Sequence, residues 1–304
     1  MKILIIGGSG LLGCKTAKLA VKLNHDVFIT YLLRPMKIEG STAFKLDKCE
    51  RDSVFSLFEK VKPEVVIDTA ALHNVNYCEA HKDEAWKVNV EGTRNVAEAC
   101  KKINGKMIFI STDYVFDGKK GFYNENDEPN PLNYYGKTKL EAEKILRSLE
   151  LEYLIARTSV IYGWNPSEIS GLKSSSGKSM NFVIWTLKKL RNKEPVQIVT
   201  DQFSSPTLAD NLAEVLLVMA SSNKSGVYHT AGKSCLNRYE FTLKIAEIFN
   251  LDKNLIKPTT SDVFKQVAER PKRCCLDVNK AEKDFGVKFL TVEQGLHEMK
   301  KQEP

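Results

Sequence analysis

The sequence lacks a long hydrophobic run. Its apolar stretches are only a few residues long, whereas a membrane-spanning helix needs about 20 apolar residues in succession. The chain reaches Gly7 directly after Ile3-Leu4-Ile5-Ile6, which is too early for the apolar region of a signal peptide. We therefore expect no contact with a membrane and a cytoplasmic location, and we interpret the first apolar run as a buried strand.

Metal-binding and disulfide patterns are also missing. The seven cysteines form no CxxC pair, and the five histidines show no ligand spacing. An odd, scattered set of cysteines predicts reduced thiols and no metal site. The neighbours Cys274 and Cys275 are poorly placed to bridge each other.

A concentrated block of positive charge is absent as well. The net charge is +7, from 45 basic and 38 acidic residues, and the lysines are spread along the chain. There is no array of basic and aromatic residues, so we expect no nucleic-acid partner. The charge is consistent with a solvated basic surface or with steering of an anionic ligand such as a nucleotide.

What the chain does contain is a regular alternation of strand and helix patterns over its first 160 residues. This alternation predicts an α/β fold, a doubly wound parallel sheet of the Rossmann type with helices on both faces. The predicted strands are 3–6, 27–31, 43–46, 65–68, 107–111 and 153–157, and the predicted helices are 11–23, 52–60, 83–102 and 135–149.

The pattern loosens after Arg157 and predicts a smaller C-terminal α/β substrate domain. We expect helices near 180–192, 207–221, 238–249 and 291–301, and strands at 196–199 and 227–230. The predicted dinucleotide domain spans 1–160 with a returning segment at about 195–232, and the substrate domain spans 161–194 and 233–304. The Ser- and Gly-rich stretch within 163–179 is interpreted as a loop, either a lid or a linker.

Gly7, Gly10 and Gly13 stand in GxxGxxG spacing between the first strand and the first helix. Glycine permits the tight turn, the close approach of backbone to a pyrophosphate and the packing of helix on strand. The N-terminus of the helix then presents free N–H groups to the phosphates. The spacing predicts a dinucleotide site, although a simple strand–helix turn has the same pattern.

The end of the second predicted strand bears on the choice of cofactor. An acidic residue there would bind the ribose hydroxyls of NAD, but the strand continues to Arg34 without one. Arg34 is placed to meet the 2′-phosphate of NADPH, which is the expected cofactor, with NADH possible; a plain surface arginine is the alternative. Asp47 is expected near the adenine, and Ala70 and Ala71 are small enough for the cofactor to lie against the backbone.

Tyr135 and Lys139 are one helical turn apart and therefore share a helix face. A nearby ammonium favours the phenolate, so we expect Lys139 to lower the pKa of Tyr135. Thr112 follows the strand at 107–111, at the carboxyl edge where doubly wound sheets bind ligands. Tyr134 is the alternative phenol, but it would lie on a different helix face from Lys139.

These features resemble the extended short-chain dehydrogenase/reductase family. The segments STDYVFDG (111–118) and PLNYYGKTKL (131–140) are similar to those of the dTDP-4-dehydrorhamnose reductase group. Asp201-Gln202-Phe203, Pro206-Thr207, and Arg270-Pro271 with Leu276-Asp277 are similar too, in the same order over nearly the whole chain.

The resemblance implies hydride transfer from NADPH to C4 of a dTDP-linked 4-keto-6-deoxy sugar, with Thr112, Tyr135 and Lys139 as the catalytic residues and dTDP-L-rhamnose as the product. It also implies a possible homodimer. The expected cofactor contacts are Gly7, Ser9, Gly10, Leu11, Leu12, Gly13, Tyr31, Arg34, Asp47, Ala70, Ala71, Leu72, Asn89, Ser111, Tyr135, Lys139 and Thr158. The expected substrate contacts are His73, Thr112, Asp113, Tyr114, Asn181, Gln202 and Arg270, with Phe182 beside Asn181.

Several alternatives remain open. The bacterial reductases commonly have a tryptophan where this chain has Val160, and the nearest tryptophan is Trp164. His73 has packing as its alternative role, and Asp113 has the capping of a turn. Arg270 is the expected contact to the diphosphate, because a planar guanidinium suits phosphate oxygens. Its alternative role is an ion pair with Glu269.

The same blocks also resemble the regulatory β subunit of methionine adenosyltransferase, which keeps the NADP site and the Tyr–Lys pair. A sugar-nucleotide epimerase or dehydratase is a further alternative. Dehydration is disfavoured because Asp113 is followed by Tyr114 rather than by an acid.

Overall fold

The computed structural model describes residues 1–33, 35–167, 180–264 and 266–304. The predicted cofactor contact Arg34 lies outside the described residues, and so does most of the loop expected over 163–179.

Within the described residues a seven-stranded, entirely parallel sheet forms the centre of the larger part, which confirms the predicted α/β doubly wound fold. Its strand order is β11-β6-β5-β4-β1-β2-β3, so the order reverses between β1 and β4, where such sheets bind ligands. The strands are β1 (Lys2–Ile6), β2 (Asp26–Tyr31), β3 (Ser41–Lys45), β4 (Val65–Asp68), β5 (Lys106–Thr112), β6 (Tyr153–Thr158) and β11 (Gly226–His229).

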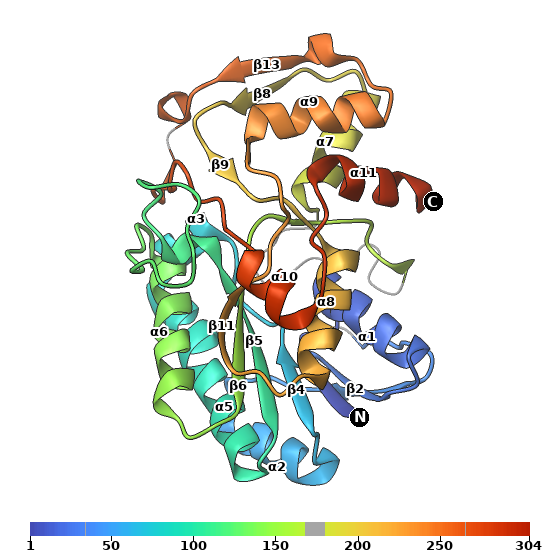
Figure 1. Cartoon of the computed structure of the whole chain (residues 1–304), viewed down its shortest axis with the longest axis vertical. Helices are drawn as coiled ribbons and strands as arrows, with labels where there is room; N and C mark the ends of the chain where they lie inside the picture. The colour runs from blue at the N-terminus through green and yellow to red at the C-terminus, as the bar shows by residue number, and fades with distance from the viewer. Residues whose placement is uncertain (34, 168–179, 265) are drawn as a thin grey trace.

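Helices cover both faces of this sheet (Figure 1). Helices α1 (Leu11–Lys22) and α8 (Ala209–Ser221) pack together on one face, and α2 (Arg51–Val61), α5 (Gly92–Lys102) and α6 (Tyr134–Ser148) pack on the other. The central strands are therefore buried on both sides, which explains why they read as continuous apolar runs.

The helix predicted over 83–102 contains an irregularity. It consists of α4 (Lys82–Trp86), a π-helical turn η1 (Lys87–Glu91) and α5 in direct succession. Single π-helical turns inside α-helices are often found at functional sites. Lys87 and Val88 of this turn line the cavity described below.

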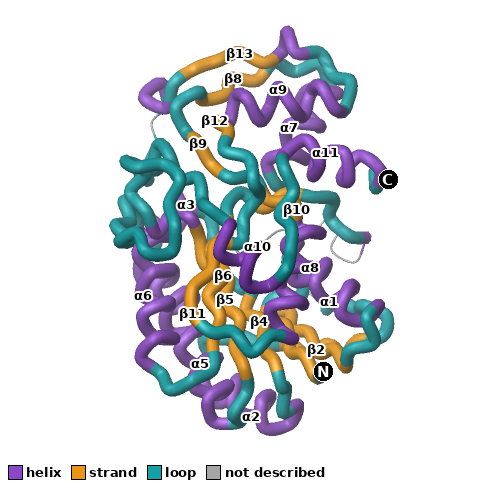
Figure 2. Tube along the Cα trace, viewed as in Figure 1, coloured by secondary structure: helices purple, strands orange, loops and turns teal. Residues whose placement is uncertain are grey.

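The smaller part lies above the carboxyl edge of the sheet in Figures 1 and 2. Its helices α7 (Phe182–Arg191), α9 (Arg238–Ile248) and α11 (Val292–Lys301) enclose a separate apolar core. Its strands pair two by two: β7 (Ile161–Tyr162) with β10 (Thr207–Leu208), β9 (Phe203–Ser204) with β12 (Leu236–Asn237), and β8 (Val196–Val199) with β13 (Ile256–Thr259). The remaining short helices are α3 (Val75–Ala80), η2 (Asp113–Val115), η4 (Lys253–Leu255), η5 (Ser261–Val263) and α10 (Asn279–Phe285).

The middle of the chain contributes to both parts. Of the segment predicted to return at about 195–232, β11 joins the large sheet and α8 packs on α1, whereas β8 pairs with β13 in the smaller part. We propose that the returning segment begins near α8 and that the division into two domains otherwise follows the predicted one.

The expectation that all cysteines are reduced thiols is wrong. Cys235 and Cys275 form a disulfide with their Cα atoms 5.5 Å apart. The pair is 40 residues apart in sequence, so spacing alone gave no sign of it. The remaining cysteines, all in the described part of the chain, form no disulfide.

Among the described residues, no helix combines the length and apolar character needed to cross a membrane.

A buried ion pair fixes α6 against the sheet. Arg157 of β6 donates from Nε and Nη2 to the two carboxylate oxygens of Glu143, at 2.9 and 2.6 Å, and neither side chain is exposed. Ser111 donates to the same carboxylate at 2.6 Å. Glu143 lies one turn after Lys139 on α6, so this pair also sets the position of Lys139.

We expect Glu143→Gln to lower the free energy of unfolding by about 3 to 5 kcal/mol, because it leaves a buried guanidinium without a countercharge. Urea denaturation measures this. Glu141→Gln is the matched control on the same helix, since Glu141 pairs with Lys144 in solvent, and we expect it to change stability by less than about 0.5 kcal/mol. Equal effects of the two variants would contradict the role given to Glu143.

Candidate active site

The turn after β1 is shaped by two glycines. Gly7 has φ +85°, and a Cβ on it would lie 2.9 Å from the backbone nitrogen of Ala70. A Cβ on Gly13 would lie only 2.4 Å from the carbonyl oxygen of Gly7. Glycine is therefore required at both positions by close backbone approach, as the GxxGxxG spacing predicts.

Helix α1 begins directly after this turn, with Gly10 as its N-cap residue and no acidic residue in its first turn. The first N–H groups of a helix have no partner within the helix, and the helix dipole places partial positive charge there. The turn and the helix end together fit the pyrophosphate of a dinucleotide.

A cavity of about 1170 Å³ extends from this turn to α7 and α9. It is lined by most of the residues predicted from the sequence. From the cofactor set these are Gly7, Ser9, Gly10, Leu11, Leu12, Gly13, Tyr31, Asp47, Ala70, Ala71, Leu72, Ser111, Tyr135, Lys139 and Thr158, and from the substrate set His73, Thr112, Asp113, Tyr114 and Asn181.

Asn89, a predicted cofactor contact, lies behind the cavity wall. Its amide accepts from the backbone nitrogen of Leu72 at 2.8 Å and donates to the Leu72 carbonyl at 3.0 Å and to Thr138 at 3.1 Å. Asn89 belongs to the π-helical turn, and it holds the backbone at Leu72 rather than lining the cavity.

Gln202 and Arg270, predicted substrate contacts, do not line this cavity either. The side-chain Nε2 of Gln202 lies 3.5 Å from Oε1 of Gln266. Arg270 donates to Gln266 and to the carbonyl of Ala268, and its other terminal nitrogen donates to Asn76, each at 2.9 Å. In this structure Arg270 connects the segment 266–268 to α3, and it forms no ion pair with Glu269.

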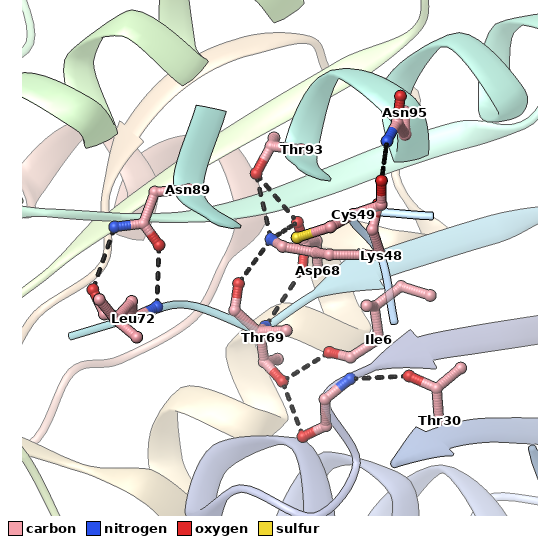
Figure 3. Close-up of polar contacts among 12 residues, drawn as sticks. Ile6, Thr30, Lys48, Cys49, Asp68, Thr69, Leu72, Asn89, Thr93 and Asn95 are labelled. Atoms are coloured by element: carbon pink, nitrogen blue, oxygen red, sulfur yellow. Dashed lines mark hydrogen bonds and ion pairs between the residues drawn. The ribbon is translucent and has the colours of Figure 1, made fainter. Parts of the chain in front are cut away.

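Lys48 lines the cavity but was not predicted from the sequence. Figure 3 shows its polar contacts. Its ammonium is 3.0 Å from Asp68 Oδ2 and donates to the Ala70 carbonyl at 2.7 Å and to Thr93 at 3.1 Å. Lys48 and Asp68 are both buried. The sequence signal was its place directly after Asp47, at the carboxyl end of the third strand.

Helix α6 brings Tyr135 and Lys139 to the cavity wall. Its N-cap Asn133 accepts from Gly136 N at 2.9 Å. A Cβ on Gly136 would lie 2.1 Å from the Tyr114 carbonyl, so glycine lets the helix start against the strand end that carries Thr112. Tyr134 does not line the cavity, which favours Tyr135 as the reactive phenol.

Two aromatic residues from α7 close the far end of the cavity. Phe182 and Trp185 line it together with Val160. Trp164 does not take the place of the expected tryptophan, because its indole donates to the Met299 carbonyl at 2.7 Å and packs on Phe249.

The family model described as "RmlD substrate binding domain" matches residues 1–303. The chain belongs to this family.

Individual relatives agree with this assignment. The dTDP-4-dehydrorhamnose reductase of Aggregatibacter actinomycetemcomitans is 32% identical over 298 residues, covering 94% of each chain. The crystal structure of dTDP-4-dehydrorhamnose reductase from Bacillus anthracis in complex with NADP has a TM-score of 0.87 and 27% identity, covering 100% of both chains. Methionine adenosyltransferase 2 subunit beta of Bos taurus is 30% identical over 293 residues, covering 92% of this chain and 81% of that protein.

In this RmlD-family site the pKa of Tyr135 is raised, whereas the sequence analysis predicted a lowered value. Burial raises the pKa of Tyr135 above its usual range, and a hydrogen bond with Thr112 opposes that effect. The Lys139 ammonium lies 3.8 Å from the centre of the Phe109 ring. Burial, and then the positive charge of Lys48, lower the pKa of Lys139 to about 7, so its own charge is disfavoured.

Ser111 and Asp113 flank Thr112 with different partners. Ser111 lines the cavity, but its hydroxyl donates to Glu143. Asp113 accepts from Thr112 at 3.0 Å and from Ser159 at 2.6 Å. Burial raises the pKa of Asp113 to about 6, and these hydrogen bonds oppose the shift.

No group of three or more His, Cys, Asp or Glu residues among the described parts of the chain is arranged to hold a metal ion.

The Asp113 carboxyl gives a testable pH dependence of stability. Its pKa is raised from 3.8 to about 6 by folding, so the folded state holds the proton more tightly than the unfolded state. The contribution of the protonated Asp113 carboxyl to the free energy of unfolding is fully present below about pH 3.8. This contribution is lost as the pH rises to about 6. Relative to Asp113→Asn, the wild type should lose about 3 kcal/mol of unfolding free energy across that range.

Urea titrations at a series of pH values measure this difference. Asp117→Asn is the control, because a hydrogen bond from Tyr123 lowers the pKa of Asp117 and its stabilising contribution is lost only at lower pH. A pH-independent difference between wild type and Asp113→Asn would contradict the assignment.

Proposed function

We propose that this protein is an NADPH-dependent reductase of a nucleotide-linked ketosugar. The specific reaction we propose is reduction of the C4 ketone of dTDP-4-dehydro-6-deoxy-L-mannose to dTDP-L-rhamnose. The observation that carries the proposal is that one cavity contains both the glycine turn and the Thr112–Tyr135–Lys139 group.

The fit of a dinucleotide is supported by the cradle at Gly7 and Gly13, which any side chain would fill. Bound there, NADPH would supply a hydride to the carbonyl carbon of the sugar. The residues proposed to hold it are those of the glycine turn, Ala70, Ala71 and Lys139, with Arg34 toward the 2′-phosphate.

The proton comes from Tyr135 in this proposal. Burial keeps the Tyr135 phenol protonated, which is the form that can donate to the oxygen of the reduced carbonyl. In this proposal the Thr112 hydroxyl, which donates to Asp113 in this structure, would turn to donate to the same oxygen. Lys139, one turn along α6, would stabilise the phenolate that remains, because an ammonium favours the charged form of a phenol.

A second function is favoured by a specific comparison, since methionine adenosyltransferase 2 subunit beta matches at 30% identity. In that case the chain would be a regulatory subunit that binds NADP and a methionine adenosyltransferase. It predicts tight NADPH binding and co-purification with that enzyme, but no turnover of a ketosugar. Another nucleotide-sugar reductase or epimerase is the remaining enzyme alternative.

We expect Tyr135→Phe to reduce turnover by about 10²- to 10⁴-fold, the usual contribution of a positioned proton donor. NADPH affinity should remain unchanged. NADPH oxidation is followed by absorbance with dTDP-4-dehydro-6-deoxy-L-mannose made in situ.

Tyr134→Phe is the matched control, because Tyr134 precedes Tyr135 on α6 but does not line the cavity. Full activity of Tyr135→Phe would refute the proposed proton donor. Absence of oxidation by the wild type, with NADPH bound tightly, would favour the regulatory subunit.

Arg34→Ala should raise the KM for NADPH much more than the KM for NADH, because only NADPH carries the 2′-phosphate that Arg34 is proposed to meet. Lys37→Ala, which removes a nearby exposed positive charge, is the control. Equal changes in the two KM values for Arg34→Ala would contradict the proposed NADPH preference.

A further inference from the structure

The cavity contains an arginine that the sequence analysis did not select. Arg238 lines the cavity together with Thr112, Asp113, Tyr114 and Phe182. It is the first residue of α9, whose start is fixed by a capping box between Asn237 and Glu240. A rigid backbone therefore places this side chain over the substrate end of the cavity.

The guanidinium of Arg238 is held by stacking alone. Its Cζ atom lies 5.0 Å from the centre of the Phe182 ring, and in the described parts of the chain no residue forms a hydrogen bond or ion pair with it. Stacking on an aromatic face leaves the N–H groups at the edge of a guanidinium available. Arg270, by contrast, already donates to Gln266, Ala268 and Asn76.

Among the described residues, Asp113 carries a carboxylate that interacts with Arg238 without forming an ion pair with it. The charge of Arg238 lowers the pKa of Asp113, so the two are close enough to interact. Both oxygens of Asp113 already accept hydrogen bonds, from Thr112 and from Ser159. Arg238 thus keeps an unused planar set of donors, which matches the geometry of phosphate oxygens.

We propose that Arg238, rather than Arg270, binds the diphosphate of the nucleotide-sugar substrate and makes that diphosphate a requirement for binding. This inference rests on the proposed function, because it assigns the anionic part of the same substrate. A sugar held at Thr112 and Tyr135 would place its diphosphate toward Arg238, and the nucleoside would extend toward Trp185.

The test measures binding of dTDP and of thymidine by titration calorimetry, with the protein saturated with NADP. We expect Arg238→Gln to weaken dTDP binding by about 10- to 100-fold, the range for loss of charged hydrogen bonds. Thymidine binding should be unchanged, since thymidine has no phosphate. Arg238→Lys should give an intermediate affinity for dTDP, because it keeps the charge but loses the fork.

Arg273→Gln is the matched control. Arg273 stacks on Phe203 at 4.9 Å in the same way, but it is exposed and does not line the cavity. We expect Arg273→Gln to bind dTDP with the same affinity as the wild type. We expect Arg270→Gln to lose less affinity for dTDP than Arg238→Gln loses.

Two results of the titrations with Arg238→Gln would contradict the inference. One is wild-type affinity of Arg238→Gln for dTDP. The other is an equal loss for dTDP and thymidine, which would show that Arg238 only supports the structure.

Parallel titrations with UDP and GDP separate this inference from the proposed reaction. If no dTDP-ketosugar is turned over but one of the three diphosphates binds in an Arg238-dependent way, the reaction is wrong and the inference stands. If the wild type binds none of the three, the inference is wrong regardless of turnover.

Discussion

An ion pair between the buried residues Lys48 and Asp68 lies at the carboxyl edge of the sheet, and its charges act on a second buried lysine, Lys139. The site depends on this arrangement. Lys48 and Lys139 are 5% and 2% exposed, and Asp68 is 1% exposed. A buried ammonium is stable only when it is paired and hydrogen-bonded. Asp68, Thr93 and the Ala70 carbonyl meet this need for Lys48. The ends of β3 and β4 and the start of α5 must therefore converge beside the helix that carries Lys139.

This convergence controls the charges that the proposed chemistry uses. Burial and then the positive charge of Lys48 disfavour the charge on Lys139, whereas Asp68 and Glu143 favour it. The result is a lysine whose pKa is about 7, close to a tyrosine that burial keeps protonated. Such a pair is suited to releasing a proton from the phenol and then compensating the negative charge left behind.

The sequence predicted the features that depend on local pattern. Three features were predicted because each has its own local pattern. They are the apolar runs of the central strands, the glycine spacing at Gly7 and Gly13, and the helical spacing of Tyr135 and Lys139. Features that depend on distant packing were missed or wrong. Lys48 forms its polar contacts with Asp68 and Thr93, which are 20 and 45 residues away in sequence. The Cys235–Cys275 disulfide joins segments 40 residues apart. The strands β7, β9, β10 and β12 are each two residues long, too short for an alternating pattern. Gln202 was predicted from resemblance, and Arg270 from resemblance and its planar guanidinium. In this structure both residues form hydrogen bonds with Gln266, and Arg270 also donates to Asn76.

The most direct test of the account follows the hydride itself. The protein would be incubated with NADPH deuterated at C4 of the nicotinamide and with dTDP-4-dehydro-6-deoxy-L-mannose, and the product would be analysed by mass spectrometry and NMR. The account predicts one deuterium at C4 of the sugar, since cofactor and substrate share one cavity. A product without deuterium, or no product while both ligands are bound, would contradict it.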